Sequence, residues 1–263
     1  MDMAPRWEGG WGFQWRYEYR ESGKLLNGDS KASNPFGRDK KVEKLWLEGV
    51  YTFKRELRLT LKVPWVEQSR TVVEGASAVK LRGSGLGDSI LGLQLKHYYN
   101  KDKSTGNFGL TPSIRVPSGS TSDSYPVGDG SWDVGLSASY SAEFAKLYQF
   151  YDLFYWENTN GEKGIHQGDE LGFDMNIGIH PYHNNDTNTG IFLMMDLSAR
   201  YEEKGRDTVG VTGGKRLSLG PVFVWYRNNL MVRSEIKFPV YEDVVGTQVS
   251  RGTEYNIGFG LTF

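Results

Sequence analysis

Few residues in this chain have the chemistry that catalysis needs. The sequence contains four histidines and no cysteine, so it has neither a thiolate nucleophile nor a thiolate metal site. A barrel lipid hydrolase would need a histidine, a serine and an acidic or polar partner close together. His97 and Ser89 share a face of one expected strand, but eight residues separate them by roughly 26 Å, and only pairing across strands would change that. We therefore expect no enzyme, no catalytic residue, no bound metal and no cofactor.

Charged residues form a second group, because they recur at alternate positions between apolar residues. In the barrel derived below, these charges turn toward the interior, where they must be paired. One interpretation is a network of ion pairs that stiffens the wall, and another, compatible with it, is a narrow polar constriction that sets selectivity. The two signs nearly balance, which argues against a strong preference for anions or cations. The expected lining residues are Arg16, Arg20, Lys62, Arg115, Asp152, Asp174, Asp196, Arg200, Arg233, Glu235 and Lys237.

Strict alternation of apolar and polar residues locates the strands that hold these side chains. In the first segment, Trp11, Trp15 and Tyr19 take one face, and Arg16 and Glu18 take the other. No amphipathic helix gives this pattern, because neighbours on a helix face are three and four residues apart. The pattern recurs along the chain in segments 11–20, 44–53, 57–65, 91–96, 108–116, 132–140, 147–156, 171–180, 191–201, 216–225, 230–238 and 254–263.

Segment 147–156 is ambiguous, since both of its faces carry aromatic residues. We place Asp152 on the inward face because a carboxylate in the middle of a bilayer is costly. That choice turns Phe150, Phe154 and Trp156 inward as well, and Leu153 outward.

The segments have the length that tilted transmembrane strands need, roughly ten residues. Residues 54–56 and 227–229 are tight turns, whereas the polar stretches 21–41, 69–88, 117–131, 157–170 and 239–252 are expected to be long loops. Short turns on one side and long loops on the other are the outer-membrane arrangement. We predict one all-β domain, residues 1–263, that forms a transmembrane antiparallel β-barrel of about twelve strands in the bacterial outer membrane, with both termini in the periplasm.

Composition excludes several other classes of protein. The 31 basic and 32 acidic residues give a net charge of −1, whereas a nucleic-acid binder needs a basic excess. Mean hydropathy is −0.52, and no stretch is apolar for long enough to form a membrane-spanning helix. A barrel in lipid accommodates both the low hydropathy and the 14% aromatic content, because only alternate residues of each strand face hydrocarbon.

A soluble β-sandwich or lipocalin-like barrel remains the main structural alternative, since alternation alone does not tell inside from outside. Several features favour the membrane. Trp11 and Trp225 fall at expected periplasmic strand ends and Trp65 and Trp132 at outer ends, as in aromatic girdles. The chain also stops on Phe263 at the end of an alternating aromatic strand, which resembles the carboxyl-terminal assembly signal of outer-membrane barrels.

Three short segments share the order aliphatic, basic, apolar, proline, and they end at Pro64, Pro117 and Pro239. Each is expected to end a strand that runs outward, because proline donates no ladder hydrogen bond and marks a bulge, an edge or a strand end. Strand termination alone would explain them. A sharper hypothesis is that these prolines open gaps in the wall near the outer leaflet, through which an apolar solute leaves sideways into lipid.

These motifs, in this order, resemble a known family. Val-Pro-Trp at 63–65, Gly-Leu-Gly-Asp at 85–88 and Val-Pro-Ser-Gly at 116–119 are similar to elements of the outer-membrane channels known as meta-pathway phenol degradation proteins. In the last motif, Ser118 stands where the family has threonine. The resemblance covers nearly the whole chain and implies a monomeric twelve-stranded channel for passive uptake of small, often hydrophobic or aromatic molecules. It implies no catalytic residues, and it assigns Asp88 a structural or constriction role.

We therefore expect a passive channel whose partners are outer-membrane lipids and lipopolysaccharide, a small-molecule substrate and, during biogenesis, the barrel assembly machinery, but not nucleic acid. One alternative is a porin for acidic oligosaccharides, which should have a strongly basic lumen. A second is a plugged structural or adhesive barrel that transports nothing. The balanced inward charge counts against the first and is compatible with the second.

Overall fold

A computed structural model describes residues 5, 7–102, 104–208 and 210–263 of the chain. It consists almost entirely of strands: β1 (Trp11–Ser22), β2 (Leu25–Gly28), β3 (Ser30–Lys31), β4 (Lys40–Lys54), β5 (Leu57–Glu74), β6 (Ser77–Leu86), β7 (Ser89–Lys101), β8 (Ser104–Val116), β9 (Asp133–Phe144), β10 (Leu147–Glu157), β11 (Glu170–Asn184), β12 (Thr189–Asp207), β13 (Gly210–Arg227), β14 (Leu230–Val249) and β15 (Thr253–Thr262), with one 3-10 turn, η1 (Glu162–Gly164).

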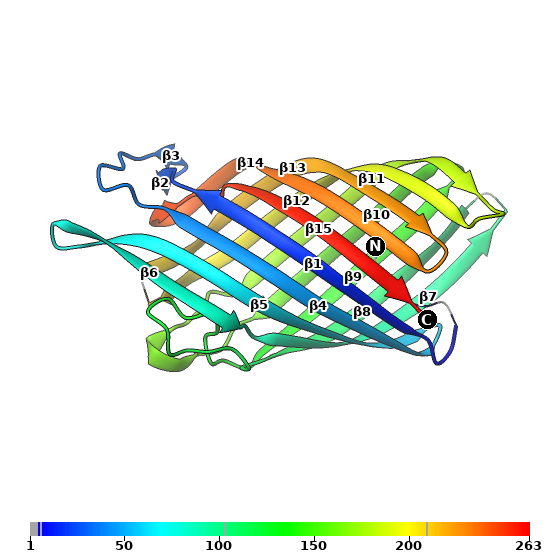
Figure 1. Cartoon of the computed structure of the whole chain (residues 1–263), viewed down its shortest axis with the longest axis horizontal. Coiled ribbons are helices and arrows are strands. Elements are labelled where there is room, and N and C mark those ends of the chain that lie inside the picture. Colours follow the sequence, from blue (N-terminus) through cyan, green and yellow to red (C-terminus); the bar gives the residue numbers. More distant parts are fainter. Residues whose placement is uncertain (1–4, 6, 103, 209) are drawn as a thin grey trace.

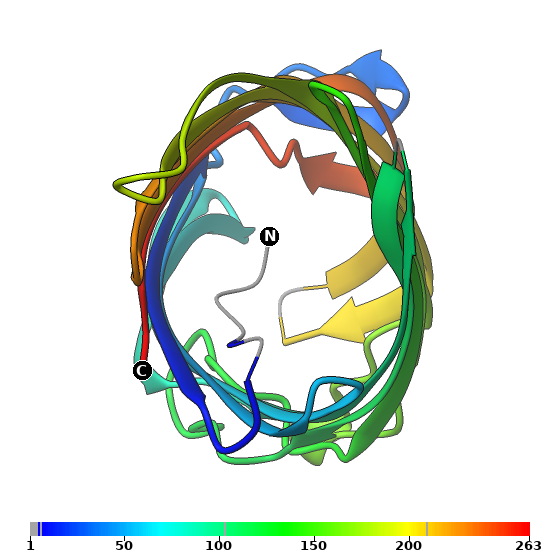
Figure 2. The ribbon, with the colours of Figure 1, turned by 90° about the vertical axis from the view of Figure 1, so that its right-hand side faces the viewer.

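Twelve of the strands close into an antiparallel barrel, as predicted (Figures 1 and 2). Their order around the wall is β1, β4, β5, β7, β8, β9, β10, β11, β12, β13, β14 and β15. The first and last of these strands pair from Gly12 with Thr262 to Glu21 with Thr253. Full closure leaves no unpaired sheet edge in the wall, which a membrane-spanning sheet requires.

The apolar face of each strand points out of the barrel, and this decides between a soluble and a membrane barrel. On β7, Leu93 is 39% exposed although its neighbour Gln94 is 9% exposed. Inside, Asp133 and Asp196 are almost completely buried. A soluble barrel would have the reverse arrangement, so this outer surface is suited to lipid. Among the described residues, none belongs to a helix with the length and apolarity needed to cross a membrane.

The ends of the wall strands differ from each other in the way the sequence predicts. At one end of the barrel the turns are short, and β1 begins and β15 ends there (Figure 1). The Trp11 N–H donates to the Phe263 carbonyl at 2.6 Å at this end. Aromatic rings gather at this end, where the centroids of Trp11 and Tyr51 are 4.6 Å apart. At the other end lie the longer connections, including the β2–β3 hairpin, which adds to β14.

Two of the segments that were expected to be long loops are largely strands in the structure, so the expectation is wrong for both. Residues 69–88 are largely the paired continuation of β5 with β6, from Trp65 with Leu86 to Glu74 with Ser77, and β14 continues to Val249. Strand pairing therefore extends beyond the segments that alternate. The sequence shows no sustained apolar and polar alternation there, although the backbone hydrogen bonds of the strands persist.

Candidate functional site

The interior of the barrel holds a cavity of about 350 Å³, and its lining is asymmetric. The walls from β1 round to β11 contribute the lining, whereas no lining residue in the described part of the chain comes from β12 to β15. The lining residues are Gly12, Phe13, Gln14, Glu48, Gly49, Val50, Thr60, Lys62, Ile90, Gln94, Lys96, Thr111, Ser113, Ser137, Ser139, Phe150, Asp152, Phe154, Trp156 and Asp174.

Strand β10 supplies the aromatic side of this cavity. Phe150, Asp152, Phe154 and Trp156 all line it, in the inward register expected from the cost of a carboxylate in lipid. Asp152 accepts a hydrogen bond from the Ser137 hydroxyl at 2.5 Å. A strand whose two faces are both aromatic thus presents three rings and one carboxylate to the lumen.

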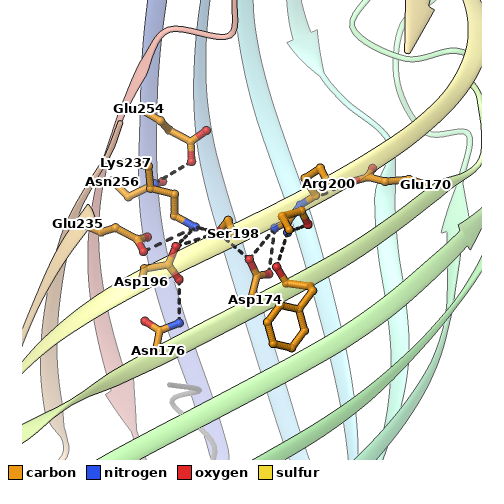
Figure 3. A network of polar contacts seen from close by, with 12 residues as sticks. Glu170, Asp174, Asn176, Asp196, Ser198, Arg200, Glu235, Lys237, Glu254 and Asn256 are labelled. Atoms are coloured by element: carbon orange, nitrogen blue, oxygen red, sulfur yellow. Dashed lines mark hydrogen bonds and ion pairs between the residues drawn. The ribbon is translucent and has the colours of Figure 1, made fainter. Parts of the chain in front are cut away.

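The opposite half of the interior is occupied by a polar network across β11, β12, β14 and β15 (Figure 3). The Nη2 atom of Arg200 donates to both carboxylate oxygens of Asp174, at 2.8 and 2.9 Å, so a single guanidinium nitrogen bridges the carboxylate. A second contact runs from Arg200 Nε to Glu170 at 3.5 Å. The Ser198 hydroxyl lies within hydrogen-bond distance of both Asp174, at 2.6 Å, and Asp196, at 2.8 Å, and so joins the two acids.

Lys237 of β14 is the second cation of this network. Its Nζ is 3.0 Å from Asp196 and 3.6 Å from Glu235, and the amide of Asn176 donates to Asp196 at 2.8 Å. Arg233 contacts Glu235 at 3.3 Å. The predicted ion-pair network is therefore present on this side, and it fills the lumen from β11 to β15 with fixed, mutually compensated charge.

Toward the short-turn end, the β12–β14 side of the interior is apolar. Phe192, Met194, Val222, Val224 and Met231 are buried against one another on β12, β13 and β14. They alternate with the lipid-facing residues of the same strands, so these strands are apolar on both faces. The signal was present in the sequence as continuous apolar runs such as 191–195, but a scan for alternation records only one face of such runs.

The remaining predicted lining residues lie on the inward face. Arg16 on β1 pairs with Glu48 at 3.0 Å, and Arg20 lies on the same strand face nearer the outer end. Arg115 on β8 pairs with the buried Asp133 at 2.9 Å. Lys62 on β5 lines the cavity itself.

Asp88 lies outside this lining. It follows β6 in the short link to β7, where its carboxylate accepts the backbone N–H groups of Gly119 at 2.9 Å and Asp129 at 3.1 Å. The pKa of this carboxyl is raised overall, because burial raises it by more than the two backbone N–H donors lower it. Asp88 thus holds the 117–132 connection in place, so the geometry supports the structural role and not the constriction role.

The expectation that three prolines end strands is wrong for Pro64 and Pro239, which lie inside β5 and β14, and it holds for Pro117, which follows β8. Pairing of β5 passes from β7 to β6 beside Pro64, between the pairs Lys62 with Ile90 and Trp65 with Leu86. The strands continue past the two prolines because long outer hairpins extend the wall.

Near Pro239, the β13–β14 register shifts by one residue between Leu217 and Ser218. Pro112 and Pro221, which the repeated proline motif does not include, also lie within wall strands. Ladder pairing is interrupted between β7 and β8 at Pro112 and between β13 and β14 at Pro221.

At the end with the long hairpins, the mouth of the barrel is partly covered by the paired ends of β12 and β13, which project into the ring in Figure 2. The hairpin bends at a bulge between Glu202 and Gly205. Opposite the bulge, Gly213 and Gly214 have φ values of +104° and +134°, and a Cβ on Gly213 would lie 2.3 Å from the Glu203 carbonyl oxygen. Only glycine fits this bend without strain.

The tip of the hairpin is fastened to the far wall. Asp207 at the end of β12 pairs with the buried guanidinium of Arg70 on β5 at 3.0 Å, although β5 and β12 are not neighbours in the barrel. The base of the hairpin is held by Gln248 of β14, whose amide donates to the Gly213 carbonyl at 2.9 Å. Neither Arg70 nor Asp207 was predicted, because the sequence gives no signal that relates them.

A closed ring with an apolar outer surface and a polar, cavity-bearing interior defines an outer-membrane β-barrel. Residues 55–263 match the family described as "Putative MetA-pathway of phenol degradation". The match spans well over half of the chain, and the chain therefore belongs to this family, as the sequence motifs indicated. A search among curated proteins finds no match.

Solved structures support the fold. The COG4313 outer membrane channel from Pseudomonas putida F1 superposes with a TM-score of 0.73 at 17% identity, covering 97% of this chain and 96% of that one. More distant similarities include OpdK of Pseudomonas aeruginosa with vanillate, with a TM-score of 0.41 at 9% identity, covering 97% of this chain and 99% of that one. The KdgM porin in complex with disordered oligogalacturonate has a TM-score of 0.44 at 10% identity, covering 96% and 99%.

Proposed function

We propose that this protein is a passive outer-membrane channel for small molecules, and that its solutes are hydrophobic or aromatic. The observation that carries the proposal is the lumen cavity, which has aromatic rings on β10 and hydroxyl groups on β8 and β9. Such a lining suits a small, weakly polar solute. Most lumen charges are already paired, so the lining lacks the basic surface that an acidic oligosaccharide would need.

The solute's exit is either axial or lateral. The lateral route is supported by the change of partner strand beside Pro64 and by the shifted register near Pro239. Both irregularities lie toward the end with the long hairpins. The short turns, the start of β1 and the end of β15 all lie at the opposite end of the barrel, and we therefore assign that end to the periplasm.

The partners follow from the same surface. We propose a monomer whose apolar belt contacts outer-membrane lipids and lipopolysaccharide, and which the barrel assembly machinery inserts into the outer membrane. Chemical cross-linking in native membranes would test the monomer, since a ladder of higher species would contradict it.

Single-channel conductance of the purified, folded protein in a planar bilayer tests the channel. Discrete, stable openings are the expected result. The parallel measurement is uptake of toluene by cells that make the protein, compared with cells that lack it.

A closed barrel without transport is the second candidate, and the hairpin fastened by Arg70 and Asp207 favours it. Silence in the bilayer together with unchanged toluene uptake would select it. Silence with faster toluene uptake would instead select the lateral route.

A further inference from the structure

The rings of β10 lie against the wall because their neighbours are glycines. Phe154 pairs with Gly172 of β11, and Trp156 pairs with Gly135 of β9. A Cβ on Gly172 would lie 2.1 Å from Phe154 Cζ, and one on Gly135 would lie 2.7 Å from the Trp156 ring. Each ring therefore occupies the volume that a neighbouring side chain would have taken, and it covers the glycine backbone while still lining the cavity.

Two arginines hold these rings from outside the cavity. The guanidinium carbon of Arg200 is 4.8 Å from the Phe154 centroid, and that of Arg115 is 4.5 Å from the Trp156 centroid. Neither arginine lines the cavity, and both are committed to carboxylates, Asp174 and Asp133 respectively. The rings are thus fixed in place by groups that offer no charge of their own to a solute. Phe154 lies over β11 and Trp156 over β9, on opposite sides of β10, and we call the two rings the ring platform.

Not every charged residue that lines the cavity has an oppositely charged partner beside it. Of the acids, Glu48 is paired with Arg16 and Asp174 with Arg200, and Asp152 accepts from Ser137. Of the two cations, Lys96 has an interaction partner. Lys62 has no hydrogen bond or ion pair to any other residue that the structure describes.

An ammonium group without a carboxylate, in a lumen walled by protein, attracts an anion. The platform attracts a flat ring, because aromatic pairs stack beyond simple area burial. At about 350 Å³, the cavity is large enough for a substituted aromatic ring.

We propose that the lumen cavity is a binding site for small aromatic carboxylates, with the ring against Phe154 and the carboxylate directed to Lys62. The hydroxyls of Thr111, Ser113 and Ser139, which line the same cavity, are placed to bind further polar substituents on the ring. The inference rests on the proposed channel function and narrows it to one substrate class. It also differs from the sequence-based expectation of no strong charge preference, because Lys62 has no ion-pair partner among the residues that the structure describes.

Ligand-detected NMR on the folded protein in detergent micelles tests the site with three probes. Benzoate carries both features, benzyl alcohol lacks the charge, and cyclohexanecarboxylate lacks the aromatic ring. Benzoate should bind about tenfold more tightly than either of the others. Equal affinity for the three probes would overturn the proposal.

Variants test separately the part of the site that binds the carboxylate and the part that binds the ring. Lys62→Gln should abolish the difference between benzoate and benzyl alcohol, and Lys62→Arg should retain it. Phe154→Leu should abolish the difference between benzoate and cyclohexanecarboxylate. The matched control is Lys80→Gln on β6, since Lys80 is exposed and faces Asp39 at 3.7 Å. Unchanged selectivity in Lys62→Gln would overturn the assignment of the carboxylate.

Each variant is first checked for folding by its heat-modifiable gel mobility. If Phe154→Leu does not fold, Phe154→Tyr keeps the ring and should keep the preference for benzoate, whose loss in that variant would contradict the stacked geometry. Bilayer recordings made in parallel distinguish a failure of the aromatic-acid site from a failure of the proposed channel function. Stable openings with no benzoate preference would overturn only the aromatic-acid site. Benzoate binding without openings or uptake would support the site and contradict the channel.

Discussion

Arg70 and Asp207 form an ion pair of 3.0 Å across the outer mouth of the barrel, although 137 positions separate them in the chain. The pair joins β5 to the tip of the β12–β13 hairpin, so two strands on different parts of the wall are connected over the lumen. The Arg70 side chain is buried, which makes the pair a stronger restraint than an exposed one.

Removing this restraint should open the outer mouth. Asp207→Asn removes the charge and keeps the size, at a cost to the closed hairpin on the order of 1 kcal/mol. The open population should then rise about fivefold, and single-channel conductance or open probability should increase. Lys80→Gln, which breaks an exposed pair on the β6 hairpin, should leave both quantities unchanged. A variant that conducts like the original protein would show that the hairpin does not obstruct flow.

Asp196→Ala should destabilise the barrel strongly. The change leaves the ammonium of Lys237 with Glu235 as its one ion-pair partner among the described residues and removes the acceptor of Asn176, and breaking a buried pair from one side costs about 3–5 kcal/mol. Urea unfolding in detergent measures the loss. Lys41→Gln, which breaks an exposed contact with Glu43, is the control and should change stability little. Equal midpoints for the two variants would mean that the lumen network does not stabilise the wall.

Gly172→Ala should push Phe154 off the wall. The new Cβ would lie 2.1 Å from the ring, so the ring has to move into the cavity, with an overpacking cost of about 1–3 kcal/mol. Conductance should fall and benzoate should bind more weakly. Gly23→Ala is the control, since Gly23 does not line the cavity and its Cβ would lie an ordinary 3.9 Å from the Arg38 carbonyl oxygen. Unaltered binding in Gly172→Ala would contradict the role of the flat ring.

Asp88→Asn should loosen the 117–132 connection. A carboxylate accepts the N–H groups of both Gly119 and Asp129, whereas an amide offers one acceptor oxygen and a donor group in place of the other. Limited proteolysis of intact cells should cut this connection faster in the variant. An unchanged cutting rate would indicate that other contacts hold it.

Replacing Pro64, Pro117 and Pro239 together with valine tests the lateral exit. Valine restores the missing backbone donors, so strand pairing should close the irregular seams beside β5 and β14, and uptake of toluene should slow. Uptake of a small polar solute that follows the axis should stay the same. Unchanged toluene uptake would rule out the proline seams as a route.

The local pattern of residues determined most of the wall. Period-two alternation marks each strand and its two faces, because successive side chains of a strand point to opposite sides. That is why the inward position of Asp152 and the inward sets that contain Asp174 and Arg200 followed from the sequence, and why twelve wall strands were predicted. The cost of a charge in lipid then identified the face that turns inward.

What fills the lumen was decided only by the tertiary structure. The Arg70–Asp207 pair, the rings laid over Gly135 and Gly172 and the cluster around Phe192 join residues from strands whose meeting depends on register and closure. Alternation assigns a side chain to the interior, but it does not say which other interior side chain it meets. Partners across a barrel are set by the closed wall as a whole, and no stretch of sequence short enough to show a pattern contains both of them.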